Sequence, residues 1–451
     1  MNLSEKNILL VGLAKTGVST LKFLNKQNAK IKVHDMKKEE DLKEILDSLK
    51  ELDNIEYILG KEVSDINEID LVVVSPGVPL DTDLFNRIRE KGVKVIGDIE
   101  LAYLFSNTSN IVGITGTNGK TTTTSLVGEI MKKINDDTYI VGNIGNPIME
   151  IIEKTSSNTC LVAELSSFQL ESISDFRPSI SAVLNLTPDH LNRHKTMENY
   201  RDAKANIFKN QESDDITVLN YDDEVVRDLS TKTNGNVVFF SRKEYLENGV
   251  CLDNVGNIVI NKDGKSQILL HKSEVSLPGA HNLENILAAV SIFSTMNCDL
   301  NIVIESLKTF GGVEHRQEFV KTVNEVHFVN DSKATNPDST IKAVESYTNP
   351  VVLIAGGMDK GGDFYELIDV INKSTVKAMV LLGETSMKIE KQANEKEFKG
   401  LIIRTHSMKD ALYAAKKIAK KGDTVLLSPA CASWDMYPNF EARGLDFKNN
   451  I

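Results

Sequence analysis

Short runs of β-branched residues alternate with longer amphipathic stretches along nearly all of the 451-residue chain. This order is typical of parallel strands joined by crossover helices, so the sequence predicts an α/β fold. The first cycle contains strands at 6–12, 30–34 and 71–74, with a helix at 16–27. A second cycle begins with a strand at 110–114 and a helix at 120–133, and continues with strands near Tyr139, Leu161 and Ala182.

The pattern predicts three domains, at 1–97, 98–311 and 312–451. The first is a small Rossmann-like unit, and the second is a P-loop ATPase-type domain with a mainly parallel sheet. Between 237 and 270 the helical pattern disappears, and turn signals at 254–257 and 262–264 predict an antiparallel edge to that sheet. After Gly311-Gly312, strands at 326–330, 351–355, 378–382, 402–404 and 424–427 predict a second Rossmann-like domain.

Composition excludes several classes of protein. The 52 basic and 64 acidic residues give a net charge of −12, which argues against a nucleic-acid-binding surface. The longest apolar stretches, such as 71–74, fall far short of the roughly 18 residues that a membrane span needs. The four cysteines are dispersed without metal-ligand spacing. We therefore expect a cytoplasmic protein with no nucleic-acid or membrane partner.

A glycine- and threonine-rich loop at 113–122 lies between a predicted strand and a predicted helix. Its glycines allow backbone N–H groups to approach phosphate oxygens, and the helix N-terminus adds partial positive charge. Lys120 would reach the β- and γ-phosphates, and Thr121 would hold Mg²⁺. Ile114 stands where the strict motif has its first glycine, but the Gly119-Lys120-Thr121 core still predicts binding of ATP or GTP.

The first domain carries Gly12-x-Ala14-x-x-Gly17 after its first strand, and Asp35 ends the second strand. This is a degraded dinucleotide fingerprint, because Ala14 replaces the glycine that lets the backbone close on a pyrophosphate. A nucleotide ligand other than NAD is the favoured interpretation. An NAD-dependent oxidoreductase and a purely structural turn remain alternatives.

Further polar residues follow predicted strands of the central domain. Glu164 ends an apolar strand beside the phosphate loop, where a carboxylate usually serves as a metal ligand. His190 ends the next strand in the same way. His190 and His194 are four residues apart, but the glutamate of a zinc protease motif is absent between them. Composition alone would make Lys204 an ordinary surface lysine.

Three polar loops follow strands of the last domain, at 330–337, 356–362 and 428–434. The carboxyl edge of an α/β sheet is where ligands bind, so these loops predict a second ligand site.

Several of these segments together resemble the Mur ligase family of ATP-dependent amide-bond ligases. They are Gly116-Thr-Asn-Gly-Lys-Thr-Thr122, Glu164-Leu-Ser-Ser-Phe-Gln169, Asp189-His190, His281-Asn282-x-x-Asn285, His315-Arg316 and Asp331-Ser-Lys-Ala-Thr-Asn336. The resemblance covers essentially the whole chain. The 331–336 segment and Ser428-Pro-Ala-Cys-Ala-Ser433 point to the members that add D-glutamate to UDP-N-acetylmuramoyl-L-alanine, in cytoplasmic peptidoglycan precursor synthesis. Another Mur or folylpolyglutamate-type ligase is the alternative within the family, and a non-catalytic P-loop switch is the alternative outside it.

The resemblance implies a role for each matching position. ATP would contact Gly116, Thr117, Asn118, Gly119, Lys120, Thr121, Thr122, Asn285, Arg316 and Asp331. The UDP-sugar would contact Lys15, Thr16, Asp35 and Asn143, and D-glutamate would contact Thr335, Lys360, Ser433 and Phe440. Mg²⁺ would be held by Thr121, Glu164, His190 and Lys204, with the lysine carbamylated by CO₂. Lys120, His190 and Lys204 would be catalytic, and a monomer is expected.

This sequence departs from the family pattern at two places. Lys37 after Met36 replaces the arginine expected in the uracil site, and Trp434 stands where a smaller apolar residue is common.

Overall fold

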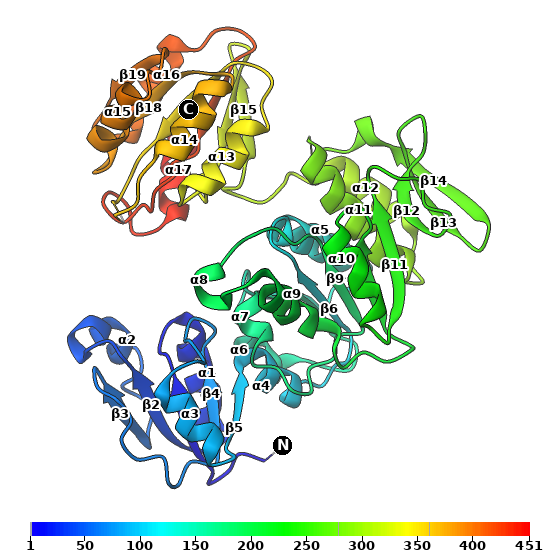
Figure 1. The fold of residues 1–451 in the computed structure, drawn as a ribbon, viewed down its shortest axis with the longest axis vertical. Helices are drawn as coiled ribbons and strands as arrows, with labels where there is room; N and C mark the ends of the chain where they lie inside the picture. The colour runs from blue at the N-terminus through cyan, green and yellow to red at the C-terminus, as the bar shows by residue number, and fades with distance from the viewer. Residues whose placement is uncertain (1, 278, 360) are drawn as a thin grey trace. The chain divides into compact units, whose positions relative to one another are not determined.

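In the computed structural model, which describes residues 2–277, 279–359 and 361–451, the strands form three sheets (Figure 1). The chain divides into two compact units, 1–310 and 311–451. The first unit contains the first two sheets, and the second unit contains the third. All three sheets are mainly parallel, which confirms the predicted α/β class.

The first sheet has the strand order β3-β2-β1-β4-β5, with every pair parallel. Side chains alternate between its faces. Leu9, Val72 and Val74 pack in one core with α3, whereas Leu10 and Val73 pack in the core on the opposite face. The elements are β1 (Asn7–Val11), α1 (Lys15–Lys26), β2 (Lys30–Asp35), α2 (Lys43–Asp47), β3 (Ile55–Leu59), β4 (Leu71–Val74), α3 (Asp83–Glu90), β5 (Lys94–Gly97) and α4 (Asp98–Phe105).

The second sheet has the order β14-β13-β12-β11-β10-β9-β6-β8-β7. Its elements are β6 (Ile111–Thr115), α5 (Lys120–Ile134), β7 (Thr138–Gly142), α6 (Ile148–Ile151), β8 (Cys160–Glu164), α7 (Ser167–Leu170), β9 (Ile180–Val183), α8 (Leu191–His194), α9 (Met197–Ala205), β10 (Ile216–Asn220), α10 (Glu224–Asp228), β11 (Asn236–Ser241), β12 (Gly249–Leu252), β13 (Asn257–Lys262), β14 (Lys265–His271), α11 (Ala280–Ser294) and α12 (Leu300–Thr309).

The antiparallel edge of this sheet is narrower than the sequence pattern predicts. The strands β12, β13 and β14 pair antiparallel through the two predicted turns, but β11 pairs with β12 in parallel. The antiparallel edge therefore begins at β12. The chain returns to the same end of the sheet between β11 and β12, so these two strands run in the same direction. Pairing direction depends on that connection and not on the local sequence.

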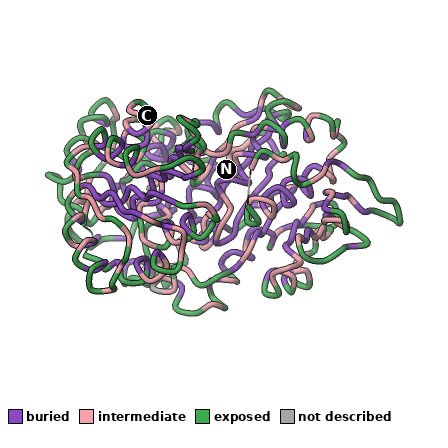
Figure 2. Tube along the Cα trace, turned by 90° about the horizontal axis from the view of Figure 1, so that it is seen from above, coloured by how far each residue is buried: buried purple, intermediate pink, exposed green. Residues whose placement is uncertain are grey.

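One hydrophobic core joins the first two sheets. It contains Leu10 and Val33 from the first sheet together with Leu161, Ala163 and Val183 from the second. The helices α5, α11 and α12 cover the other face of the second sheet and form a separate core. Buried residues, purple in Figure 2, follow the interior strands. The predicted division at 97/98 stays a prediction.

The third sheet has the order β15-β16-β20-β17-β18-β19, and only β15 is antiparallel to its neighbour among the described strands. The sequence pattern did not predict β15, whose side chains are largely half-exposed or exposed. The elements are β15 (Glu318–Val323), β16 (Val326–Asn330), α13 (Pro337–Glu345), β17 (Val351–Ala355), α14 (Tyr365–Lys373), β18 (Val376–Leu381), α15 (Ser386–Glu395), β19 (Leu401–Arg404), α16 (Met408–Ile418), β20 (Thr424–Leu427) and α17 (Phe440–Asn450).

A single buried carboxylate fixes α4 to the second sheet's loops. Glu100 is 0% exposed, and its oxygens accept hydrogen bonds from the backbone N–H groups of Ser174, Asp175 and Phe176 at 2.8, 2.8 and 3.0 Å. We expect Glu100→Ala to lower the free energy of unfolding of unit 1 by about 3 kcal/mol, because it leaves buried donors without acceptors. Urea unfolding measures the change. The exposed Glu247→Ala serves as the control, and an equal effect of both substitutions would refute this account.

Candidate active site

The loop at 116–119 leaves the central strand β6 and enters α5, as the sequence predicts. Gly119 caps the helix with φ of 80°, a left-handed conformation that favours glycine. A Cβ atom there would lie 2.1 Å from Oδ1 of Asn285, so the loop and α11 are in close contact. The predicted ATP residues of unit 1 are therefore grouped around one helix N-terminus.

A segment after β9 clamps this loop. The backbone N–H of Thr117 donates to the carbonyl of Asn185 at 2.9 Å. The backbone N–H of Asn118 donates to Oδ1 of the same residue at 2.8 Å. The Thr117 hydroxyl donates to the carbonyl of Thr187 at 3.1 Å. The sequence motifs did not reveal Asn185 or Thr187 as loop contacts, because 67 or more residues separate the partners.

Two lysines converge on the same loop. Nζ of Lys120 donates to the carbonyls of Gly116 and Thr117 at 2.9 and 2.8 Å. Nζ of Lys204 donates to the same Gly116 carbonyl at 2.8 Å, although Lys204 lies on α9. Lys204 is only 2% exposed, so it is not the surface lysine that composition alone would suggest. Burial, and then the charge of Lys120, hold the pKa of Lys204 well below its usual value.

Glu164 ends β8 directly beside β6, in register with Ile114. Its Oε1 accepts a hydrogen bond from Nδ2 of Asn143 at 2.8 Å, and the Asn143 N–H donates to the Glu164 carbonyl at 2.9 Å. The Glu164 side chain is buried, and Oε2 has no hydrogen-bond partner. A buried carboxylate oxygen without a hydrogen-bond partner costs free energy. A divalent cation would remove this cost, because such cations bind oxygen ligands, so the Glu164 carboxylate fits a divalent cation.

His190 precedes the one-turn helix α8 and adopts a left-handed φ of 53°. Its ring is half exposed and lies 3.6 Å from Oδ2 of Asp189. His194 is buried instead, with Nε2 2.9 Å from the Ser167 hydroxyl and Nδ1 3.2 Å from Glu171. The polar contacts of the two histidines therefore go to different residues, although both rings pack against Phe168.

The turn after β1 lies at the carboxyl edge of the first sheet. Gly12 has a φ of 94°, and a Cβ on Gly17 would lie 2.0 Å from the Gly12 carbonyl, which explains both glycines. Asp35 accepts backbone N–H bonds from Leu13 at 2.8 Å and from Lys37 at 2.9 Å. Asp35 thus orders this turn, while Lys15 and Thr16 lie at the start of α1.

In unit 2, three loops meet at the carboxyl edge of adjacent strands β16, β20 and β17. Ser332 Oγ donates to the carbonyl of Phe440 at 2.8 Å, and Met358 N–H donates to the carbonyl of Ala432 at 2.9 Å. Thr335 lies in the first loop, and the buried Ser433 lies in the last. Lys360 lies outside the described residues, and Trp434 is 64% exposed.

Arg443 also belongs to this loop cluster, and no sequence motif revealed it. It is 2% exposed and donates to Oγ and to the carbonyl of Ser332 at 3.0 and 2.9 Å. Burial lowers the pKa of Arg443 to about 10. This arginine fixes the shape of the loop that begins at Asp331.

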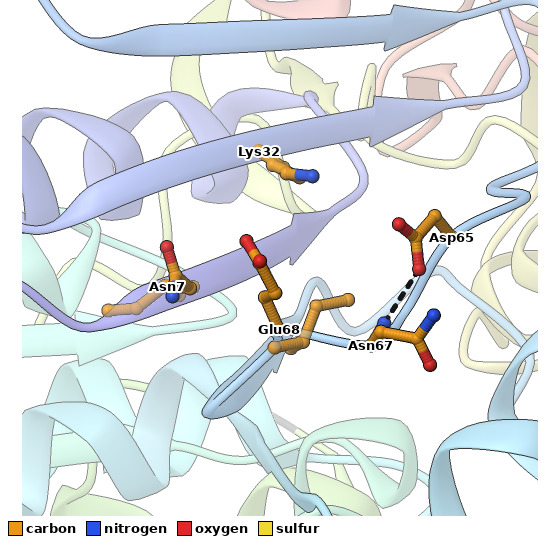
Figure 3. A pocket seen from close by; sticks show the side chains of 7 residues that line it. Asn7, Lys32, Asp65, Asn67 and Glu68 are labelled. Atoms are coloured by element: carbon orange, nitrogen blue, oxygen red, sulfur yellow. Dashed lines mark hydrogen bonds between the residues drawn. The ribbon is translucent and has the colours of Figure 1, made fainter.

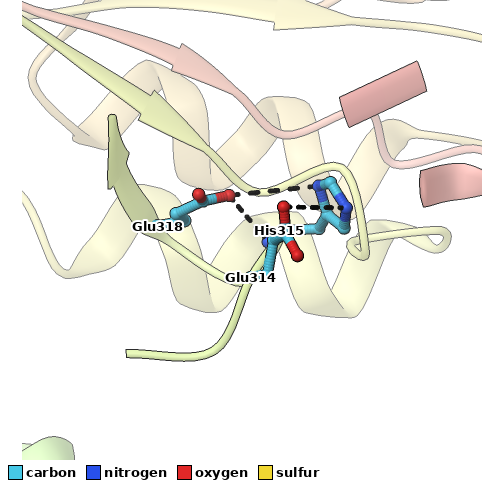
Figure 4. Close-up of side chains that lie close together, drawn as sticks. All are labelled: Glu314, His315 and Glu318. Atoms are coloured by element: carbon cyan, nitrogen blue, oxygen red, sulfur yellow. Dashed lines mark hydrogen bonds and ion pairs between the residues drawn. The ribbon is translucent and has the colours of Figure 1, made fainter. Parts of the chain in front are cut away.

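Glu314, His315 and Glu318 lie close together in unit 2, as Figure 4 shows. Lys448 already pairs with Oε1 of Glu314 at 2.9 Å and with Oε1 of Glu318 at 2.6 Å. Oε2 of Glu318 accepts a hydrogen bond from the backbone N–H of His315 at 2.9 Å. We interpret this cluster as an ion-paired clamp on the turn that carries Arg316, and not as a metal site.

Two cavities lie at the opposite, amino-terminal edge of the first sheet. The smaller one, in Figure 3, has a volume of about 10 Å³, enough for one water molecule, and is lined by Asn7, Lys32 and the 65–69 segment. The larger one, of about 680 Å³, is lined by residues near the starts of β1, β2 and β3. Neither includes a predicted site residue.

Known protein families match most of this chain. Three family models match the chain: the MurD-like N-terminal domain of Mur ligases at 6–97, the Mur ligase middle domain at 114–293, and the Mur ligase glutamate ligase domain at 315–431. Two curated relatives bear the name UDP-N-acetylmuramoylalanine--D-glutamate ligase. The one from Clostridioides difficile (strain 630) is 55% identical and the one from Alkaliphilus oremlandii (strain OhILAs) is 50% identical, each covering 100% of this chain and 99% of its own.

Solved structures share the fold at low identity. MurC from Thermotoga maritima has a TM-score of 0.57 at 19% identity, covering 94% of this chain and 95% of its own. MurF from the same organism, in complex with ADP, has a TM-score of 0.57 at 18% identity, covering 100% and 96%.

The fold defines an α/β protein whose second sheet carries a glycine- and threonine-rich loop between β6 and α5. The relatives and family models narrow that class: the chain belongs to the Mur ligase family. None of the helices in the described part of the chain combines the length and apolar character that a membrane-spanning helix requires.

Asp331 gives a testable pH dependence. Its carboxylate is 5% exposed and accepts hydrogen bonds from Ser428 Oγ and the Gln317 N–H, and burial raises its pKa to about 7. The unfolded chain has a pKa near 4, so the folded state binds the proton more tightly. Protonated Asp331 therefore stabilises the folded state by at most about 4 kcal/mol. This contribution is complete below pH about 4 and is lost as the pH rises to about 7.

Asp331→Asn, which stays neutral, should flatten this decline. Denaturant unfolding of unit 2 between pH 4 and pH 8 measures the slope. Asp338→Asn, at an exposed position of α13, should leave the slope as in the unsubstituted protein. Equal slopes for all three proteins would show that Asp331 does not titrate in this range.

Proposed function

We propose that this protein is an ATP-dependent ligase that joins D-glutamate to UDP-N-acetylmuramoyl-L-alanine during peptidoglycan precursor synthesis. The observation that carries the proposal is the largely buried cluster at the loop 116–119. Lys120 and Lys204 share the Gly116 carbonyl, and Oε2 of Glu164 next to the loop has no hydrogen-bond partner in the part of the chain that the structure describes. The names of the full-length relatives at 55% and 50% identity support the choice of substrates.

The proposal assigns one substrate to each predicted domain. Residues 1–97 would hold the UDP-sugar through Lys15, Thr16 and Asp35, with Asn143 from the next domain. Residues 98–311 would bind ATP through the loop and Asn285. Residues 312–451 would hold D-glutamate through Thr335, Lys360, Ser433 and Phe440, and would add Arg316 and Asp331 to the ATP site. We further propose that the enzyme acts in the cytoplasm as a monomer.

Side chains around the loop would act as ligands for Mg²⁺. When bound, this cation offsets negative charge on phosphoryl oxygens. Thr121, Glu164, His190 and carbamylated Lys204 are the proposed ligands. Carbamylation joins a neutral amine to CO₂ and releases a proton, and the lowered pKa of Lys204 supplies the neutral amine. The product is an anion, so it would also remove the repulsion between Lys204 and Lys120.

The reaction would take two steps. The L-alanine carboxylate oxygen bonds to the γ-phosphorus as the bond to the β-phosphate oxygen breaks, giving an acyl phosphate and ADP. The D-glutamate amine then attacks the acyl carbon, phosphate leaves, and the nitrogen loses a proton. Charge builds on phosphoryl oxygens in the first step, so Lys120 and the loop N–H groups would act by position and electrostatics.

A coupled assay of ADP release tests this function. We expect release with ATP, Mg²⁺ and UDP-N-acetylmuramoyl-L-alanine to rise strongly when D-glutamate is added. Lys120→Ala should reduce the rate at least about a hundredfold, because it removes a phosphate-binding cation. Lys132→Ala, on the exposed face of the same helix, is the matched control. A rate of ADP release that stays the same with and without both substrates would indicate a P-loop switch instead of a ligase.

Carbamylation of Lys204 has its own test. With ¹³C-labelled bicarbonate, we expect a carbamate carbon signal in the NMR spectrum of the unsubstituted protein and none in Lys204→Arg, because a guanidinium does not form the carbamate. The substitution should also lower the ligase rate at least about a hundredfold, in keeping with loss of a group that orders the transferring phosphate. Full activity of Lys204→Arg would exclude the role.

A further inference from the structure

The segment from His190 to Lys195 joins the phosphate-loop region to the first sheet. It contains the one-turn helix α8, which lies between two non-glycine residues in the left-handed region, His190 with φ of 53° and Lys195 with φ of 70°. L-residues rarely adopt this conformation, so surrounding contacts must hold the segment in place. The side chains of Arg193 and His194 make these contacts.

Arg193 bridges two parts of unit 1. One guanidinium nitrogen, Nη2, donates to the carbonyl of Val78 at 3.0 Å and to Oε2 of Glu171 at 2.7 Å. The other carboxylate oxygen of Glu171 lies 3.2 Å from Nδ1 of His194. Side-chain exposure is 14% for Arg193 and 21% for Glu171, so water screens this ion pair less than an exposed one.

The ring of Phe168 forms a common platform for the segment. The Arg193 guanidinium lies 4.9 Å from the ring centroid, and the His190 ring lies at the same distance in a tilted orientation. The His194 ring stacks on Phe168 at 5.5 Å. A shift of Arg193 or Phe168 would therefore move His190, which is a proposed Mg²⁺ ligand.

The other end of the bridge reaches the turn after β1. Val78 N–H donates to the Ser75 carbonyl at 3.0 Å, and the Ser75 hydroxyl donates to the Gly12 carbonyl at 2.9 Å. A Cβ on Gly12 would lie 2.9 Å from both Ser75 and Val78 side-chain atoms, so these residues are tightly packed. The contacts run without a break from the proposed nucleotide turn to His190.

We propose that Arg193 is a positioning residue that couples binding of the UDP end of the substrate to the placement of His190. The inference rests on the proposed function, which puts UDP at the Gly12 turn. A ligand that orders the turn would order Ser75 and Val78, and through Arg193 would order the 189–196 segment. The planar guanidinium can bond a carbonyl and a carboxylate while stacking on a ring, a combination that lysine does not reproduce.

Hydrogen–deuterium exchange with UDP as the probe tests this coupling. UDP lacks the sugar and the peptide, so its effect on 189–196 must pass through the protein. In the unsubstituted protein, we expect UDP to slow exchange in 12–36 and 75–80, and to slow it about threefold or more in 189–196. In Arg193→Met, protection of the first two segments should persist and protection of 189–196 should disappear.

Two further variants keep the result interpretable. Glu171→Gln weakens the same bridge from its other end and should reduce the protection of 189–196 without removing a large side chain. Arg201→Met removes an arginine of α9 that pairs with its neighbour Asp202, and should behave as the unsubstituted protein does. Equal protection of 189–196 in Arg193→Met and in the unsubstituted protein would overturn the proposal.

Failure of the coupling can be told apart from failure of the proposed function. If UDP protects 12–36 but not 189–196 in the unsubstituted protein, the nucleotide assignment stands and the coupling is wrong. If UDP protects neither segment, the nucleotide assignment fails and removes the coupling with it.

Steady-state kinetics give an independent readout. Arg193→Met should lower kcat about tenfold or more while KM for ATP stays within about twofold, and Arg193→Lys should recover only part of the loss. A purely structural role would lower the unfolding temperature and leave kcat per folded molecule unchanged, which would contradict the proposal.

Discussion

A half-buried lysine and a fully buried one share one carbonyl oxygen in the loop that follows β6. The ammonium groups of Lys120 and Lys204 both donate to Gly116, at 2.9 and 2.8 Å. Burial depresses the pKa of Lys204, and repulsion from the like charge of Lys120 lowers it further. Next to them, Oε2 of Glu164 has no hydrogen-bond partner among the described residues. Two cationic side chains and one buried carboxylate therefore come together at the loop 116–119.

The strands around this cluster explain how the chain sustains it. The central strand β6 is fully buried, and β8 and β9 pair with it on either side. Their carboxyl ends deliver the 116–119 loop, Glu164 and the Asn185 segment to one place. The apolar sheet thus supplies stability to a region in which polar and charged groups are buried. The proposed binding of anionic substrates does not depend on the net charge of −12, because the cations that would contact them are local.

Sequence patterns predicted the features that depend on neighbouring residues. The strand at Leu71–Val74, the turn at Asp263-Gly264 and the helix after Gly119 each carry their signal within a few positions. The patterns failed where distant pairing decides. The edge strand β15 is largely half-exposed or exposed, and the direction in which β11 pairs with β12 depends on the connection between them. The same limit applies to the site, where motifs gave the individual loops but not the contacts between them.

Two arginines, the half-buried Arg193 and the buried Arg443, show why sequence patterns did not reveal those contacts. Arg193 meets Val78 across 115 positions, and Arg443 meets Ser332 across 111. Neither residue lies in a recognisable motif, and composition favours a surface position for any arginine. Each is nevertheless held by a backbone carbonyl next to a ligand-type loop. A guanidinium can satisfy several acceptors at once, so one residue fixes the relative position of two loops that the fold alone leaves adjustable. The loops that we propose to bind substrates are therefore positioned by long-range arginine contacts, while the motifs within them would supply the chemical groups.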